Sequence, residues 1–348
     1  MKKLLVVVMV IGLAVNVFGA GAPEREDELP VLRVAMVPYL NSLPIQFAYD
    51  EGWDVEHGLK LDLEVYSLGP PMLEALAANR WDVGSIGSAG VYGVASYEAK
   101  VIGDTLLASG GLELFVRPDS DILSVRGHNP DFPEVYGNPE TVEGSTIITS
   151  IGSFVHLGLL RWLEILGVSE DDVDIVHMDT VQTYQAFRAG RGDVIAFSPP
   201  LNYRAADEGW EVIATMSNMD YPIYDMLLAN PRIYDEKKDL LVKFVELYYR
   251  AADYLTANPD LLVERQVQFQ RENGLDSTEA DVRDEIQNRT YVTSDLALAR
   301  ARDGRVGESV RNHALFEIEK GTIEADQIDK YGPHNLVSEI ILEALGDS

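Results

Sequence analysis

Five short loops of this 348-residue sequence combine residue types that bind a small anionic or polar molecule. They are residues 38–42, 68–71, 87–90, 150–154 and 197–200. Most of them place Gly, Ser or Pro at the start of a predicted helix, where free backbone N–H groups bind an anion without a basic side chain. None contains Lys or Arg, so a sulfonate, nitrate or carboxylate would be held by backbone and hydroxyl donors. Because the same residues also begin ordinary helices, the prediction rests on all five loops together.

These loops supply most of the candidate ligand-binding residues. The candidates are Tyr39, Asn41, Ser42, Gly69, Pro70, Gly87, Ser88, Ala89, Gly152, Ser153, Phe154, Ser198 and Pro199, with Tyr224 added from a later segment. We expect Asn41, Ser88 and Ser153 to donate hydrogen bonds to ligand oxygens, and the aromatic candidates to form a wall. Asp220 and Asp225 could meet an amine on the ligand. The loops are equally compatible with a neutral or zwitterionic ligand.

The sequence offers little for catalysis or metal binding. It contains no cysteine, which excludes disulfides, thiolate metal sites and a cysteine nucleophile. Its six histidines show no spacing typical of a metal site. The loop from Gly87 to Gly90 is not a nucleophile elbow, because Ile86 stands where that motif needs glycine. We therefore expect a protein that is not an enzyme and that binds neither a cofactor nor a metal.

A repeated unit indicates how the loops are positioned. Residues 73–83 recur in outline at 184–194, with five identical pairs that include Asp82 and Asp193. Each copy lies between two strand-like runs, and a spacing of 111 residues is too wide for a solenoid but fits two similar α/β lobes. Two lobes leave a cleft, and in open α/β sheets ligands bind outside the carboxyl ends of the strands. The two repeated aspartates are expected to fix the turn between helix and strand.

The chain is long enough for two domains with real cores. The predicted division is residues 30–117 for the first part of lobe 1, residues 118–216 for lobe 2 with a surface excursion at 118–144, and residues 217–348 for the rest of lobe 1. The last part is expected to begin with a strand near 222–231 and to continue as helices. Two crossing segments, near 117–121 and 216–221, would then act as a hinge.

Residues 1–22 are typical of a secretory signal peptide. Lys2 and Lys3 give a positive start, the apolar run from Leu4 to Val15 follows, and small residues complete the segment. No cysteine follows the apolar run, so a lipid anchor is excluded. The mature protein is expected to be a free monomer in the periplasm, with an uncleaved N-terminal anchor as the alternative.

The charge of the chain restricts its partners. The formal net charge is −29, which argues against nucleic acid and anionic membrane surfaces as partners. An acidic surface with few lysines is also what a saline habitat favours, so the charge does not by itself indicate the ligand.

From about Leu32 to Thr215 the chain resembles the periplasmic substrate-binding proteins of the sulfonate/nitrate/taurine class of ABC transporters. The matching segments are Ser67–Leu76, Asp82–Gly87, Gly152-Ser153 before a Leu-rich helix that ends at Gly167, and Ala186–Gly190 with Asp193. The resemblance implies a type II periplasmic-binding-protein fold, which has two α/β lobes joined by a two-segment hinge, here followed by a helical C-terminal part. It also implies capture of a small, often anionic ligand and its delivery to an ABC permease and ATPase complex. A binder of thiamine-pyrimidine precursors is a variant within the same class.

A second resemblance indicates an alternative function. Residues 37–44 (Val-Pro-Tyr-Leu-Asn-Ser-Leu-Pro) look like the start of the chorismate dehydratases of the menaquinone pathway, which share this fold. That resemblance would give catalytic roles to Asn41 and to Ser88 or Ser85. Those enzymes are cytoplasmic and shorter, whereas this chain carries an export signal, so the transport function is preferred. A ligand-sensing subunit of a membrane receptor is a third possibility, because the fold alone does not fix the function.

Overall fold

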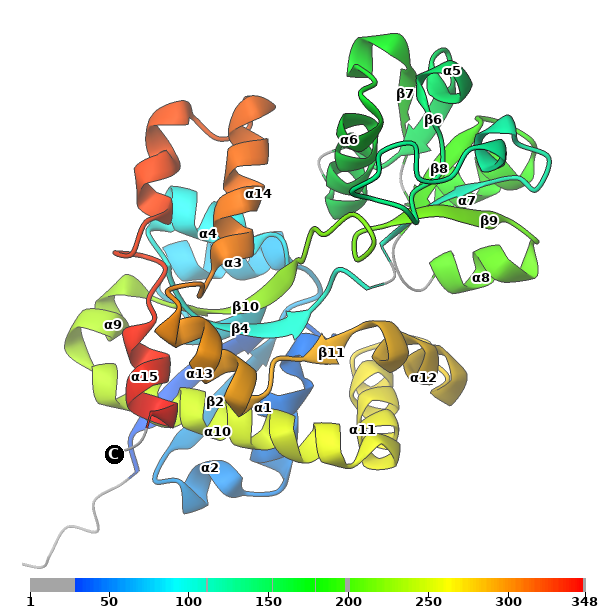
Figure 1. Cartoon of the computed structure of the whole chain (residues 1–348). Coiled ribbons are helices and arrows are strands. Elements are labelled where there is room, and N and C mark those ends of the chain that lie inside the picture. Colours follow the sequence, from blue (N-terminus) through cyan, green and yellow to red (C-terminus); the bar gives the residue numbers. More distant parts are fainter. Residues whose placement is uncertain (1–28, 111, 152, 179, 198–200, 347–348) are drawn as a thin grey trace, which may run out of the picture.

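The computed structural model describes residues 29–346, except 111, 152, 179 and 198–200. Two α/β lobes, each built on its own sheet, are connected through a narrow waist (Figure 1). Among the described helices, none is both long enough and apolar enough to cross a membrane.

Both lobes use the same strand order. Lobe 1 has the order β11-β4-β10-β3-β1-β2, and lobe 2 has the order β7-β6-β8-β5-β9. The strands of lobe 1 are β1 (Val31–Met36), β2 (Lys60–Val65), β3 (Val83–Ile86), β4 (Lys100–Leu107), β10 (Tyr224–Ala229) and β11 (Thr290–Tyr291). The strands of lobe 2 are β5 (Glu113–Val116), β6 (Thr146–Thr149), β7 (Asp174–His177), β8 (Val194–Phe197) and β9 (Glu211–Thr215). In each sheet three neighbouring strands run parallel: β3, β1 and β2 in lobe 1, and β7, β6 and β8 in lobe 2. The strand next to them, β10 in lobe 1 and β5 in lobe 2, runs antiparallel, and the chain enters it directly from the other lobe. This is the predicted two-lobed fold.

The sequence repeat corresponds to a structural repeat. Helix α3 (Gly69–Ala77) and helix α7 (Thr180–Arg188) start 111 residues apart, as do β3 and β8. The repeated aspartates lie at the predicted turns, where Oδ2 of Asp82 accepts a hydrogen bond from the backbone N–H of Arg33 at 3.0 Å. Oδ2 of Asp193 accepts one from the backbone N–H of Thr146 at 2.8 Å. Each aspartate therefore ties the repeated helix–turn–strand unit to the middle one of the three parallel strands of its own lobe, β1 or β6.

The first predicted crossing, near 117–121, is wrong. Strand β5 pairs with β8 and β9 of lobe 2, so the chain has already left lobe 1 and crosses between the end of β4 and the start of β5. The second crossing, residues 216–223, contains the predicted segment 216–221. The boundary of lobe 2 therefore moves from residue 118 to residue 113. The partner of a strand is decided by tertiary packing, which a local sequence pattern does not show.

Hydrogen bonds join the two crossings to each other. The backbone N–H of Ala108 donates to the carbonyl of Ile223 at 2.7 Å, and the N–H of Met216 donates to the carbonyl of Leu112 at 3.2 Å. The crossings therefore run side by side as one two-stranded connection, which is the geometry of a hinge.

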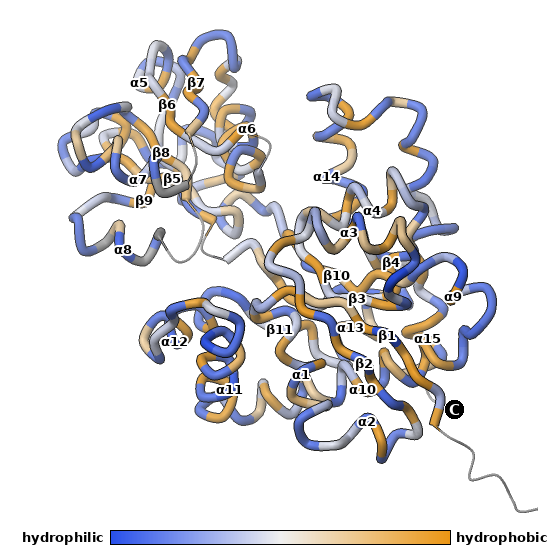
Figure 2. Tube along the Cα trace, turned by 180° about the vertical axis from the view of Figure 1, so that it is seen from behind, coloured by the Kyte–Doolittle hydropathy of each residue, from blue (hydrophilic) through white to orange (hydrophobic). Residues whose placement is uncertain are grey.

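Helices cover both sheets, and the apolar residues concentrate on the strands between them (Figure 2). Helices α1 (Leu43–Asp50) and α2 (Trp53–Glu56) are separated at Gly52, which adopts a left-handed conformation (φ 72°). The other helices are α4 (Gly90–Tyr97), α5 (Pro139–Val142), α6 (Phe154–Leu166), α8 (Leu201–Asp207), α9 (Pro231–Glu236), α10 (Lys238–Ala257), α11 (Pro259–Glu272), α12 (Glu279–Asn288), α13 (Ser294–Arg302), α14 (Glu308–Glu319) and α15 (Glu339–Leu345). A 3-10 turn, η1 (Leu40–Ser42), precedes α1.

The segment 118–144, expected as a surface excursion, is anchored to lobe 2. Val135 and Val142 are buried in the core of that lobe. The indole N–H of Trp162, on α6, donates to the carbonyl of Tyr136 at 2.9 Å. The excursion is therefore a packed cover of lobe 2.

Candidate ligand-binding cleft

A cavity of about 520 Å³ lies between the two lobes, at the carboxyl ends of their parallel strands. Its lining residues are Val37, Tyr39, Asn41, Leu68, Gly87, Ser88, Ala108, Leu112, Ser153, Phe154, Val155, Asp225 and Arg289. Residues of the first hinge crossing thus line the same cavity as the loops of both lobes. A ligand in this cavity would contact both lobes and the hinge at once.

Six of the predicted residues line the cavity: Tyr39, Asn41, Gly87, Ser88, Ser153 and Phe154. Five others are described but are not part of its lining: Ser42, Gly69, Pro70, Ala89 and Tyr224. The remaining three, Gly152, Ser198 and Pro199, lie outside the described residues.

The five residues away from the lining include several with structural roles. Ser42 is fully buried in η1. A Cβ at Gly69 would lie 2.5 Å from the Cβ of Ala89, so these two residues pack the start of α3 against the loop after β3. The ring of Tyr224 lies under the guanidinium of Arg300, 4.1 Å from ring centroid to Cζ. Small residues and an aromatic near strand ends thus serve packing here.

Asn41 provides a hydrogen-bond donor at the cavity wall. Its backbone carbonyl accepts hydrogen bonds from the hydroxyls of Ser85 and Tyr248, each at 3.0 Å, which fixes the loop. The residue is 1% exposed, and the described part of the chain gives its Nδ2 no partner. A buried donor without a partner costs about 1–3 kcal/mol, so a ligand oxygen that accepts from Nδ2 would recover that free energy.

Ser153 takes a different role from the predicted one. It precedes α6, and its Oγ donates to the carbonyl of Ser150 at 2.6 Å, so its proton is already used. The hydroxyl can still accept a hydrogen bond, while the backbone N–H groups of Phe154 and Val155, at the start of α6, are potential donors at this edge of lobe 2. The anion-binding property predicted for this loop therefore belongs to the backbone.

Asp225 and Arg289 form an ion pair at the lobe 1 side of the cavity. Nη2 of Arg289 lies 3.4 Å from Oδ2 of Asp225, and its Nη1 lies 2.7 Å from Oε1 of Glu285. Burial raises the pKa of Asp225 to about 6, because the loss of solvation outweighs the opposing charge of Arg289. Burial, followed by the charge of Glu285, also raises the pKa of Tyr39, whose phenol stays protonated at neutral pH.

Arg289 was not predicted, and it is the one basic side chain among the described residues that line the cavity. It follows α12, far in sequence from the five loops, in a helical region without a recognisable motif. Only the fold brings it beside Asp225. Asp220, considered together with Asp225, instead lines a separate groove of about 810 Å³ between α6 and α14.

The lobes also meet through α6 and α14. The ring centroids of Phe154 and His313 are 4.7 Å apart, and those of His156 and Phe316 are 5.8 Å apart. Phe154 lines the cavity, so one of its walls is supported from lobe 1 by α14. In Figure 1, α14 rises from lobe 1 on the side of α6.

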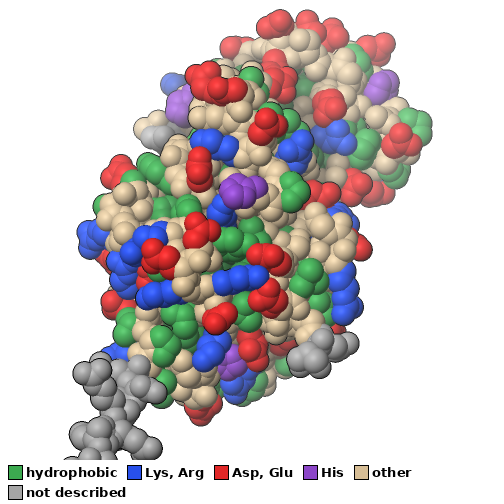
Figure 3. All heavy atoms as spheres, turned by 90° about the vertical axis from the view of Figure 1, so that its left-hand side faces the viewer, with side chains coloured by type: hydrophobic (Ala, Val, Ile, Leu, Met, Phe, Trp, Pro, Cys, Tyr) green, Lys and Arg blue, Asp and Glu red, His purple; other side chains and the backbone are tan. Residues whose placement is uncertain are grey.

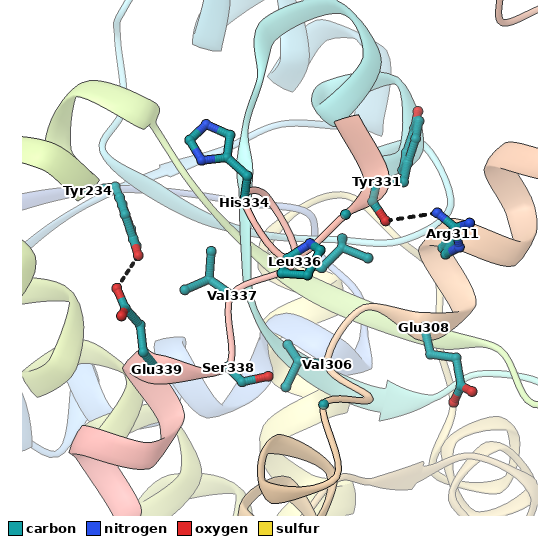
Figure 4. Close-up of a pocket in the computed structure, with 13 residues that line it drawn as sticks. Tyr234, Val306, Glu308, Arg311, Tyr331, His334, Leu336, Val337, Ser338 and Glu339 are labelled. Atoms are coloured by element: carbon teal, nitrogen blue, oxygen red, sulfur yellow. Dashed lines mark hydrogen bonds between the residues drawn. The ribbon is translucent and has the colours of Figure 1, made fainter. Parts of the chain in front are cut away.

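Another large cavity, about 770 Å³, lies within lobe 1 away from the hinge (Figure 4). Two of its polar side chains already have partners: the hydroxyl of Tyr234 donates to Glu339, and Nη1 of Arg311 donates to the carbonyl of Tyr331 at 3.3 Å. Movement of one lobe against the other would not change its lining. The cleft between the lobes is therefore the stronger candidate for ligand binding.

The structure is that of a two-lobed solute-binding protein. It has two lobes of the same topology, two chain segments that cross between them, and a cavity where the strand ends of the two lobes face each other. Residues 25–264 match the model of the NMT1-like family, and the chain belongs to that family. A relative from Brachyspira hyodysenteriae, which carries the name of an ABC transporter periplasmic binding protein, is 35% identical over 314 residues, covering 90% of this chain and 89% of the relative. The aliphatic sulfonates-binding protein of Bacillus subtilis is 26% identical, covering 72% and 73%.

Solved structures share the fold at low sequence identity. The periplasmic aliphatic sulphonate binding protein SsuA of Escherichia coli superimposes with a TM-score of 0.67 at 17% identity, over 86% of this chain and 91% of that chain. The desulfurization enzyme DszB superimposes with a TM-score of 0.58 at 15% identity, over 91% and 99%. The fold thus serves both binding proteins and at least one enzyme.

Proposed function

We propose that this protein is the extracytoplasmic binding component of an ABC importer, which captures a small organic ligand between its lobes and delivers it to a permease and ATPase complex. The observation that carries the proposal is the buried Nδ2 of Asn41, without a partner in the described part of the chain, at the wall of a cavity that both lobes line. The names of the relatives support a ligand with a sulfonate-like or other anionic head group.

The proposal is tested by a thermal-shift screen of sulfonates, carboxylates, pyrimidines and flavins, followed by calorimetry on the hits. A ligand present at ~100 times its dissociation constant should add ~2.7 kcal/mol of stability. The radius of gyration measured by small-angle scattering should fall when the true ligand is added, because the lobes close around it. The proposal would be refuted by a ligand that saturates the protein without changing its radius of gyration and that binds Asn41→Ala as tightly as the parent. Such a ligand would bind outside the cleft.

The protein is proposed to bind its ligand without chemical change. The DszB structure means that the fold by itself does not exclude catalysis, so an enzyme related to chorismate dehydratase is the alternative. Incubation with chorismate distinguishes the two functions. We expect chorismate to be recovered intact, and steady turnover that depends on Asn41 and Ser88 would establish the alternative.

Export to the periplasm as a monomer completes the proposal. Residues 1–22, the expected signal peptide, lie outside the described residues, and the periplasmic relative from Brachyspira hyodysenteriae supports the location. N-terminal sequencing of the exported protein should start between Ala20 and Pro23, and light scattering should give the mass of one chain. An intact Met1 on soluble exported protein would contradict cleavage.

A further inference from the structure

Helix α14 contributes to two hydrophobic cores. Val310 and Ala314 belong to the core cluster of lobe 1, whereas Phe316 belongs to the core cluster of lobe 2. Positions 310 and 314 of a helix share one face and position 316 points away from it, so α14 presents one face to each lobe. Lobe 1 also fixes the beginning of the helix, because Oγ of Ser309 accepts a hydrogen bond from the backbone N–H of Tyr224, the first residue after the second crossing, at 3.2 Å. The helix is therefore an arm of lobe 1 whose second half packs against lobe 2.

The partner of α14 in lobe 2 is α6, the helix that begins at the cleft. The ring centroids of Phe154 and His313 lie 4.7 Å apart, and the ring of His156 meets that of Phe316 nearly edge-on, at 5.8 Å and 73°. His156, His313 and Phe316 are 3%, 4% and 7% exposed, so water has little access to this junction. Phe154 also lines the cleft. The junction outside the hinge and the ligand cavity therefore share a side chain.

The packing of α14 resists separation of the lobes. Because α14 moves with lobe 1 and α6 moves with lobe 2, a rotation about the hinge that separates the lobes would draw Phe316 out of the lobe 2 core. Exposing a buried aromatic side chain to water is unfavourable. The ion pair of Lys320 and Glu170 crosses the same junction, but it is partly exposed and contributes little. Apolar packing around Phe316 therefore favours the arrangement in which the lobes lie together.

We propose, on the basis of the solute-binding function above, that α14 is a latch between the lobes, which favours their closed arrangement through Phe316 and His313 and thereby raises ligand affinity from outside the cleft. Neither residue is among the described residues that line the cavity. They act on the fraction of molecules whose lobes are closed, and the apparent dissociation constant rises as that fraction falls. Phe154 links the latch to the ligand, because the side chain that contacts His313 also forms a wall of the cavity.

The first test truncates the latch. Phe316→Ala removes the ring from the lobe 2 core, and Leu315→Ala is the matched control, because Leu315 is the preceding residue of α14, is 47% exposed and belongs to neither core cluster. Small-angle scattering without ligand should give Phe316→Ala a larger radius of gyration than the parent and the control. Calorimetry with the tightest-binding compound of the thermal-shift screen should show an affinity at least roughly threefold weaker in Phe316→Ala and unchanged in the control. An unchanged radius of gyration, an unchanged affinity or tighter binding in Phe316→Ala would overturn the inference.

A crosslink separates loss of the latch from damage to the fold. The chain has no cysteine, so Glu170→Cys and Lys320→Cys can be joined across the junction by a short bismaleimide. In the Phe316→Ala background the crosslink should restore the radius of gyration and the affinity of the parent, because it replaces the lost contact without repairing a misfolded core. If it restores neither, or if the crosslinked parent binds the compound more weakly than before crosslinking, the junction does not favour the closed arrangement and the inference is wrong. Failure of every screened compound to bind would instead overturn the proposed function, whereas the radius of gyration of ligand-free Phe316→Ala would still test the latch.

Discussion

Lobe 1 and lobe 2 have the same topology but provide different chemistry to the cleft. Lobe 1 contributes Asn41, whose buried Nδ2 has no partner among the described residues, and the ion pair of Asp225 and Arg289. The described lining residues of lobe 2 include the hydroxyl of Ser153 and the apolar side chains of Phe154 and Val155, and none of them is charged. No lysine occurs anywhere between residues 113 and 215. Among the described lining residues, the charged side chains therefore all belong to lobe 1.

The difference arises in the parts of lobe 1 that have no counterpart in the repeat. Asp225 lies on the strand that returns from lobe 2, and Arg289 follows α12 in the C-terminal helical region. The repeated unit positions the strand-end loops, whereas the charged side chains of Asp225 and Arg289 come from elements outside the repeat. The face of the molecule shown in Figure 3 does not indicate this asymmetry, since acidic side chains are spread over both lobes there with basic ones among them.

The largest expected difference between the lobes concerns the repeated aspartates. Asp82 is 5% exposed, and besides the N–H of Arg33 it binds Nε of that residue at 3.1 Å and its Nη2 at 2.5 Å. Asp193 is exposed. We expect Asp82→Ala to lower the free energy of unfolding by about 2–4 kcal/mol, because it leaves a backbone N–H without its acceptor and removes an ion pair that is partly open to solvent on the arginine side, and Asp193→Ala by about 1 kcal/mol. Urea denaturation of the two variants measures both values, and equal losses would mean that the two turns are equivalent.

The pH dependence of stability tests whether Asp225 is destabilised by burial. Its pKa is raised from 3.8 to about 6 in the folded protein, so folding favours its protonated form. Between pH 4 and pH 6 the folded state binds more protons at this residue than the unfolded state, and its contribution to stability falls as the pH rises. Without ligand, Asp225→Asn should therefore gain stability relative to the parent as the pH rises from 4 to 7, by up to about 3 kcal/mol. A difference that stays constant over this range would show that Asp225 does not titrate there.

Ligand affinity should also respond more strongly to lobe 1 than to lobe 2. Asn41→Ala removes a donor that has no other partner among the described residues, and it should weaken binding roughly tenfold or more. Ser153→Ala should weaken binding only several-fold, because that hydroxyl already donates to Ser150. Calorimetry with the ligand found in the screen measures both effects. Ser42→Ala is the control, since it removes a buried hydroxyl next to Asn41 that is not part of the cavity lining. If Ser153→Ala weakened binding more than Asn41→Ala did, lobe 2 would be the more important lobe for affinity.

The sequence predicted the features that depend on local pattern. The strand-end loops that contain Asn41, Ser88 and Ser153 were identified, because Gly, Ser and Pro between a strand and a helix form a local pattern. The two lobes followed from the repeat. Local pattern and the repeat together were therefore sufficient to predict a cleft at the strand ends.

What the sequence did not predict depends on contacts between distant segments. Arg289 and Asp225 are 64 residues apart and meet only after the return strand and α12 have packed. The first crossing was misplaced because β5 pairs with strands that lie much later in the chain. The hydrogen bond from Ser153 to Ser150 was also missed, since a serine that starts a helix equally suits capping, ligand binding or a local turn.

The smallest expected effect concerns the contact between the lobes outside the hinge. Nζ of Lys320, just after α14, lies 2.6 Å and 2.7 Å from the two carboxylate oxygens of Glu170 in lobe 2. Both side chains are partly exposed, at 26% and 42%, so solvent screens the pair, and exposed pairs contribute about 0.2–1 kcal/mol. Phe316, also on α14, is 7% exposed and packs in the core cluster of lobe 2, so apolar contact is expected to carry most of this junction. A double-mutant cycle with Lys320→Ala and Glu170→Ala should therefore give a coupling below about 1 kcal/mol that shrinks further in 1 M salt, where the Debye length is about 3 Å. A larger coupling that persists at high salt would mean that the ion pair, and not apolar contact, holds α14 against lobe 2.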